Sequence, residues 1–134
     1  MVDYRDSYQS GARRYDVGER GNIHLVTMVK TGLCQLLDWG VDNIQHTIGA
    51  RTDRIAVRAA DRGITTLPAE HRAGHYLGLR FPAGVPEGLA DRLAQGKVYV
   101  SVRGRDAVRV TPHLWVTDED EERFFTVLTS ALTQ

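Results

Sequence analysis

The stretch Val98–Asp120, VYVSVRGRDAVRVTPHLWVTDED, joins two alternating apolar runs, a tight turn and the start of a helix. Valines alternate with polar residues before the turn Gly104–Asp106 and again after it, which is the period of a strand with one buried face. Gly and Asp are residues that favour turns. The stretch therefore predicts a β-hairpin whose valines share one core-facing side.

The polar side of this hairpin carries two guanidinium groups among hydroxyls. If the valines face the core, the opposite face holds Tyr99, Ser101, Arg103, Arg109 and Thr111. Arginine offers a planar fork of donors that can bind a carboxylate or phosphate through two hydrogen bonds. Antiparallel sheets also often leave one face in water, so a merely solvated face is an alternative that the pattern leaves open.

Apolar residues at helical spacing predict helices on both sides of the hairpin. Asn22 is a suitable cap for a first helix that ends before Gly40, and Thr117 with Asp120 resembles a capping box for the last one. The other expected elements are a second helix from Val41 to Gly63, strands at Ile64–Leu67 and His75–Pro82, and a short helix at Glu87–Gln95. The resulting order, ααββαββα, predicts an α+β fold in which helices cover a mainly antiparallel sheet of about four strands.

The composition of the chain limits the classes of function and partner that we expect. The chain has 134 residues and 17 basic and 17 acidic side chains, so its zero net charge gives no general attraction to nucleic acid or an anionic membrane. A single cysteine excludes an intrachain disulfide, and no apolar run reaches membrane-spanning length. We expect a cytoplasmic protein that binds neither nucleic acid nor membrane.

Several chemistries lack their motifs in this sequence. The five histidines form no HExxH, and the one cysteine has no second cysteine beside it, so we expect no metal site. The phosphate-binding loops of nucleotide enzymes and the nucleophile elbow of hydrolases are also missing. The acidic run at 118–122 is best explained as a helix start that complements the helix dipole.

The run SVRGRDAVRVTPHLWVTDEDEERFF, together with RRYDVGERGNIHLVTM and DWGVDNIQ upstream, resembles the C-terminal end of class V aminotransferases. These enzymes use pyridoxal phosphate (PLP) and include cysteine desulfurases, kynureninases and isopenicillin N epimerase-like proteins. The matched segments cover nearly the whole chain in the family's order. The family's Tyr-Asn pair is replaced by Trp115 and Val116, and its Thr or Ser near the first helix by Glu19.

The resemblance implies a fold and a set of roles. Residues 1–21 would be a connector or N-terminal arm, and residues 22–134 the small C-terminal domain of a fold-type I PLP enzyme. Arg109 matches the arginine that grips the α-carboxylate of the amino-acid substrate. Gly18, Arg20 and Asn22 match the segment that approaches the cofactor phosphate of the partner subunit, where the amides at a helix start suit an anion.

The same resemblance implies that the catalytic residues lie elsewhere. The family's large domain supplies the Schiff-base lysine, and neither Lys30 nor Lys97 occupies that position. We therefore expect no catalytic residue in this chain, no PLP bound to it alone, and a large PLP-binding domain or chain as its partner within a homo-oligomer. A free-standing, non-catalytic interaction or dimerisation domain is the alternative.

Overall fold

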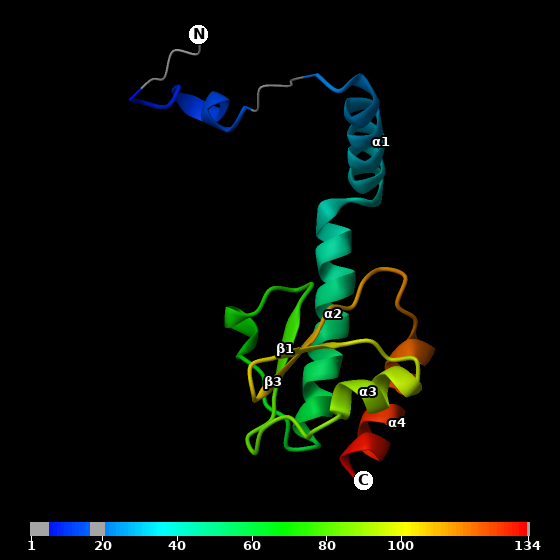
Figure 1. Cartoon of the computed structure of the whole chain (residues 1–134). Helices are drawn as coiled ribbons and strands as arrows, with labels where there is room; N and C mark the ends of the chain where they lie inside the picture. Colours follow the sequence, from blue (N-terminus) through cyan, green and yellow to red (C-terminus); the bar gives the residue numbers. More distant parts are fainter. Residues whose placement is uncertain (1–5, 17–20, 134) are drawn as a thin grey trace. The chain divides into compact units, whose positions relative to one another are not determined.

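The computed structural model describes residues 6–16 and 21–133 (Figure 1). The chain divides into two compact units, Met1–Trp39 and Gly40–Gln134. The three antiparallel strands and the larger helices of the second unit confirm the predicted α+β class.

The first unit contains the short 3-10 helix η1, Gly11–Tyr15, and the helix α1, Ile23–Trp39. The prediction that Asn22 caps α1 is confirmed, because its side-chain oxygen accepts a hydrogen bond of 3.1 Å from the backbone N–H of Leu25. None of the residues of α1 is buried within this unit. Its large exposed apolar side chains are Ile23, Leu25, Val26, Met28, Val29, Leu33, Leu36, Leu37 and Trp39.

The second unit is built on a sheet of three strands, β1 Leu77–Arg80, β2 Ser101–Arg103 and β3 Ala107–Val110. The strand order is β1-β3-β2, and both pairings are antiparallel. The hairpin predicted from the sequence is therefore present as β2 and β3, and it places β3 in the centre of the sheet. Because β3 is the central strand, each of its outward-facing residues has a neighbouring residue of β1 on one side and of β2 on the other.

The sheet has fewer strands than expected. The segment predicted as a strand at Ile64–Leu67 forms only one bridge, in which the backbone groups of Thr65 and Arg80 exchange hydrogen bonds of 2.9 and 2.7 Å. Pro68 follows directly and has no N–H to continue a ladder, which accounts for the early end of the pairing. The first expected strand is thus a bridge at the edge of β1.

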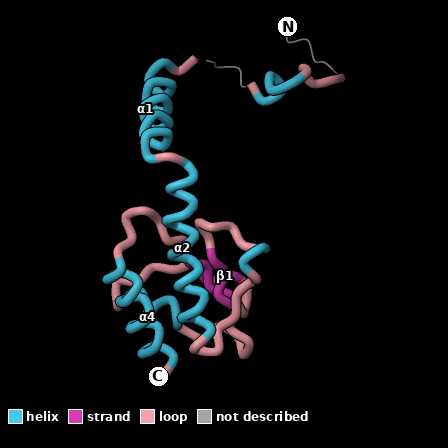
Figure 2. The backbone as a smooth tube through the Cα atoms, turned by 180° about the vertical axis from the view of Figure 1, so that it is seen from behind, coloured by secondary structure: helices cyan, strands magenta, loops and turns pink. Residues whose placement is uncertain are grey.

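Helices cover one face of the sheet. They are α2 Val41–Ala60, α3 Leu89–Gln95 and α4 Asp118–Leu132. The short 3-10 helix η2, Ala69–His71, lies beside β1, where His71 lines a cavity together with Gly78. In Figure 1 the sheet lies in front of α2, and from behind, in Figure 2, α2 and α4 lie in front of the strands. The buried core lies between these layers and contains Ile55 and Ala59 from α2, Leu89 and Leu93 from α3, Phe124, Phe125 and Leu128 from α4, and Leu77, Leu79 and Val108 from the sheet.

The start of α4 follows the predicted capping box. The Thr117 hydroxyl accepts a hydrogen bond from the Asp120 backbone N–H at 3.2 Å, and the Asp120 carboxylate accepts one from the Thr117 backbone N–H at 3.0 Å. Asp therefore does here what Glu or Gln does in the usual motif. This pair of hydrogen bonds determines the residue at which α4 begins, and with it the position of the acidic residues that follow.

Candidate functional site

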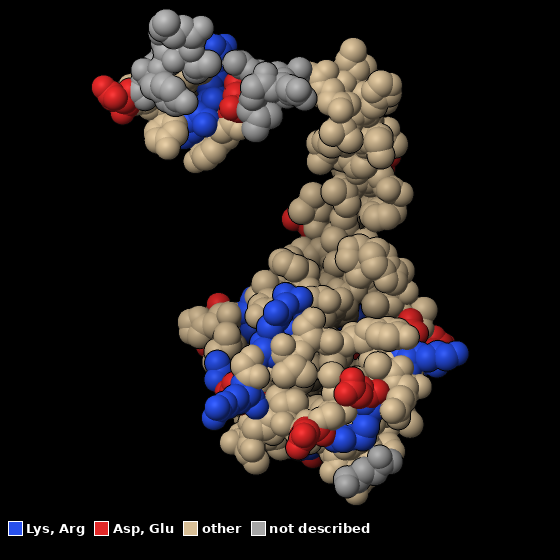
Figure 3. Space-filling view, in the orientation of Figure 1, with Lys and Arg blue, Asp and Glu red and all other residues tan. Residues whose placement is uncertain are grey.

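The face of the sheet that no α-helix covers is rich in arginine. Leu77, Leu79 and Val108 are buried, so the residues that alternate with them point to the other side. The register lines up Gly78, Arg109 and Ser101 in one row across the three strands and Arg80, Ala107 and Arg103 in the next. Basic side chains gather on the side of this unit where Figure 1 draws β1 and β3 (Figure 3).

Arg109 stands at the centre of this open face. It belongs to the middle strand, with Gly78 opposite it on β1 and Ser101 opposite it on β2. Its Nη2 donates a long hydrogen bond of 3.4 Å to the Ser101 hydroxyl, and the two residues are half-buried. A guanidinium has five N–H donors, so most of those of Arg109 are available to a ligand.

Acidic side chains do not neutralise this centre. Among the described residues, none forms an ion pair with Arg109 or Arg103, whereas Arg80 pairs with Asp106 at 3.0 Å. The predicted grouping of Ser101, Arg103 and Arg109 on one face is confirmed by the register. The open face thus carries uncompensated positive charge beside small and hydroxyl residues, which is suited to binding a carboxylate.

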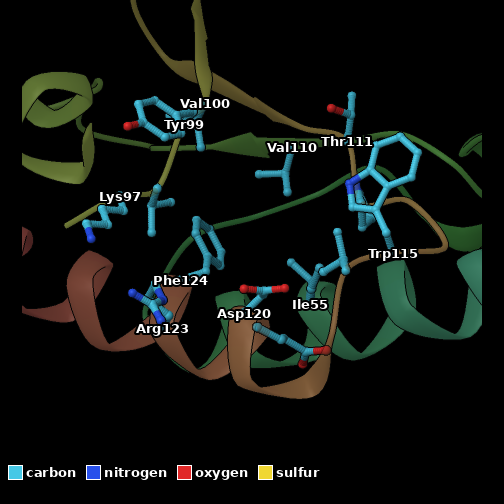
Figure 4. A pocket seen from close by; sticks show the side chains of 14 residues that line it. Ile55, Lys97, Tyr99, Val100, Val110, Thr111, Trp115, Asp120, Arg123 and Phe124 are labelled. Atoms are coloured by element: carbon cyan, nitrogen blue, oxygen red, sulfur yellow. The ribbon is translucent and has the colours of Figure 1, made fainter. Parts of the chain in front are cut away.

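The other two residues predicted for this face, Tyr99 and Thr111, line a cleft of about 370 Å³ (Figure 4). Strand β2 begins only at Ser101, so the alternation of the hairpin does not extend to Tyr99. Figure 4 shows Ile55 and Phe124 below the cleft and Trp115 beside it. The arginine-bearing face therefore extends only over the paired residues of β2 and β3, and Tyr99 and Thr111 lie beyond it.

The two acidic side chains of this cleft have structural partners. Hydrogen bonds from the backbone N–H and the hydroxyl of Thr117 lower the pKa of Asp120, which keeps this carboxylate ionised. Glu121, which is only 5% exposed, binds arginines of α2. The two carboxylates of this cleft are therefore both engaged by neighbouring groups of the protein.

The arginines of α2 bind the start of α4, a contact that the sequence analysis did not predict. Glu121 lies 3.6 Å from Arg51, 3.1 Å from Arg54 and 3.2 Å from Arg58. The spacing of three and four residues between these arginines is the signal in the sequence, because it places them on one side of a helix. These ion pairs hold α2 and α4 together beneath the sheet.

Arg58 also joins the exposed Glu122 and the buried Phe125. Two hydrogen bonds of 2.7 and 2.8 Å connect its guanidinium to the Glu122 carboxylate. They lower the pKa of Glu122 and raise that of Arg58, because each charge favours the other. The guanidinium also lies over the ring of Phe125, 4.1 Å from its centroid, which adds a cation–π contact.

The residues predicted to approach a cofactor phosphate are only partly described. Gly18 and Arg20 lie outside the described residues. Asn22 caps α1, so its side-chain oxygen is engaged, while its side-chain N–H₂ and its backbone N–H remain possible donors to an anion. Lys30 and Lys97 are both exposed side chains.

Two further features concern the part of the chain that the structure describes. No group of three or more His, Cys, Asp or Glu side chains there could hold a metal ion. No helix in that part combines the length and the apolar character that crossing a membrane requires.

No family model, curated protein or solved structure matches this chain.

Proposed function

We propose that this chain is the small C-terminal domain of a PLP-dependent enzyme of the class V aminotransferase type, in which Arg109 binds the α-carboxylate of an amino-acid substrate. The observation that carries this proposal is the position of Arg109 on the central strand of an uncovered face. Gly78 and Ser101 flank it, and no described carboxylate pairs with it.

The geometry supports a carboxylate as the ligand. The strand fixes the direction of the Arg109 side chain, and the Ser101 hydroxyl holds one of its nitrogens. The planar fork then has donors left for both oxygens of a carboxylate, and Arg103 on the same face adds positive charge. A neutral ligand would not use this arrangement.

The partner of this domain is, in this proposal, a large PLP-binding domain or chain. Within its own unit, helix α1 leaves large apolar side chains uncovered, among them Ile23 at 78% and Leu37 at 72% exposed. Contiguous apolar surface of this kind marks a surface that binds another protein. The large domain, within a homo-oligomer, would cover it, and the same proposal places the enzyme in the cytoplasm.

The cofactor would be held by that partner. When bound, PLP supplies an electron sink for chemistry at the α-carbon of an amino acid. Of the three residues predicted to approach its phosphate, Asn22 alone lies among the described residues. In this proposal the chain orients the substrate carboxylate at Arg109 and binds the large domain through α1. We therefore expect the chain to be inactive alone.

The test is to isolate the endogenous protein from source cells with an antibody raised against this domain, after reduction of the extract with borohydride. Borohydride fixes PLP on its lysine, so mass spectrometry of the isolated material should find a phosphopyridoxyl-lysine peptide. That lysine should lie outside the 134 residues, either in a longer polypeptide or in a stoichiometric partner chain. Material at 15.0 kDa without such a peptide would refute the proposal.

The exposed face of α1 also fits the alternative, a free-standing interaction or dimerisation domain. The two functions predict different effects for substitutions of Arg109 and of residues in α1. In the enzyme, Arg109→Lys should raise the KM for the amino acid and leave PLP absorption intact. In an interaction domain, the same substitution should leave self-association unchanged, while substitutions in α1 should abolish it.

A further inference from the structure

Gly78 has no structural reason to be glycine. It lies inside strand β1, where glycine is unfavourable because it gains no packing and loses more chain entropy than other residues. Its φ is not positive, and a Cβ atom built on it would meet nothing within 4 Å. A larger residue would thus be compatible with both the backbone and its surroundings, so the missing side chain leaves free space above the sheet.

This free space adjoins a cavity of about 140 Å³ on the β1 side of the open face. Gly78 lies in its lining and is also the residue directly opposite Arg109 in the sheet register. Neighbouring strands are about 4.8 Å apart, so Arg109 and the cavity are separated by roughly the length of a short carbon chain. A ligand held at Arg109 could pass over Gly78 into the cavity.

The walls of the cavity present hydrogen-bond donors. They include Arg72, Arg80, His71 and Tyr76, with no Asp or Glu among the lining residues. Arg72 is held by Asp53 and by the Thr66 hydroxyl, and Arg80 by Asp106 through one nitrogen. Both carboxylates lie outside the lining, so they fix the guanidiniums in place while other donors of Arg72 and Arg80 can face a ligand.

We propose that this cavity binds the side-chain carboxylate of a dicarboxylic amino acid, with Gly78 as the passage between it and Arg109. The identification of Arg109 as the α-carboxylate site rests on the proposed function above. The second carboxylate is an addition, because it follows from Gly78 and from a donor-lined cavity. Arg80 is then a specificity-determining residue for the substrate side chain.

The experiment is an NMR titration of the full 134-residue chain with two probes, glutarate and butyrate. These acids have similar short carbon chains, but only glutarate has a second carboxylate. Both should shift the signals of Ser101 and Arg109, and only glutarate should also shift those of Tyr76 and Arg80. We expect glutarate to bind about tenfold more tightly, the gain from one further charge-assisted hydrogen bond.

Gly78→Val separates the cavity from general electrostatic attraction, because it blocks the passage and keeps every charge. It should remove the advantage of glutarate and leave butyrate binding in place, with a urea midpoint no lower than that of the parent chain. Should valine disturb the strand, Gly78→Ala and Arg80→Gln provide second tests, and both should reduce the advantage. Gly49→Ala, in α2, adds a methyl group where nothing lies within 4 Å and is the matched control.

The outcomes separate the two proposals. If neither acid shifts Ser101 and Arg109, the carboxylate site itself is wrong, and the cavity proposal fails with it. If butyrate binds and glutarate has no advantage, or if its advantage persists in Gly78→Val, only the cavity proposal is overturned.

Discussion

Replacing Glu121 by Gln tests whether the ion pairs between α2 and α4 stabilise the fold. Glu121 is 5% exposed, and its two oxygens lie 3.1 Å from Arg54 and 3.2 Å from Arg58. Glutamine keeps the shape of the side chain and one acceptor oxygen. Its N–H₂ group, however, would face a guanidinium that needs an acceptor, so one of the two contacts becomes repulsive.

The magnitude follows from the exposure of the partners. A shielded hydrogen bond to a charged group contributes roughly 1.5–3 kcal/mol, whereas an exposed ion pair contributes roughly 0–1 kcal/mol. The side chains of Arg54 and Arg58 are 50% and 27% exposed, so their contacts lie between these limits. We expect Glu121→Gln to lower the free energy of unfolding by about 2 kcal/mol, or Tm by roughly 8–16 °C for a domain of this size.

Glu119→Gln is the matched control, since it removes the same charge from the same first turn of α4. Glu119 makes none of the ion pairs seen among the described residues, so only its interaction with the helix dipole is lost, about 0.5 kcal/mol. Urea unfolding followed by circular dichroism measures both variants. Equal losses for Glu121→Gln and Glu119→Gln would refute the argument that the arginine contacts matter.

Three further predictions concern the stability of the second unit. Thr117→Ala removes the cap of α4 and should cost about 1 kcal/mol in urea unfolding; a variant as stable as the parent would show that the capping box is dispensable. The pKa of Asp120 and that of Glu122 are lowered in the folded chain, so each carboxylate stabilises the fold above the pKa of the unfolded state. This contribution should disappear as the pH falls through the lower folded pKa, and the stability difference between the parent and Asp120→Asn should shrink with it; a difference that is constant in acid would contradict this. Leu79→Ala opens a cavity at a residue only 1% exposed and should cost roughly 2–5 kcal/mol by the same assay, while a loss below about 1 kcal/mol would mean that the core refills the space.

The candidate site was predictable where it depended on local alternation. The polar face of the hairpin, with Ser101, Arg103 and Arg109 together, follows from period two and a turn at Gly104. The contribution of β1 was not predictable, since only the pairing of β1 with β3 places Gly78 opposite Arg109. The cavity beside Gly78 likewise needs the segment around His71 to lie along the edge of β1.

The sequence by itself determined the helices, the N-caps of α1 and α4 and the hairpin, because each depends on residues within a few positions of one another. Asn22, the capping box of Thr117 and the alternating valines are examples. The tertiary structure decided which surfaces meet. The arginines of α2 form one polar stripe in the sequence, and only folding brings Glu121, more than 60 residues away, within hydrogen-bond distance of Arg54 and Arg58. Such pairings between distant segments depend on how the layers pack around the common core, and no local pattern specifies that arrangement.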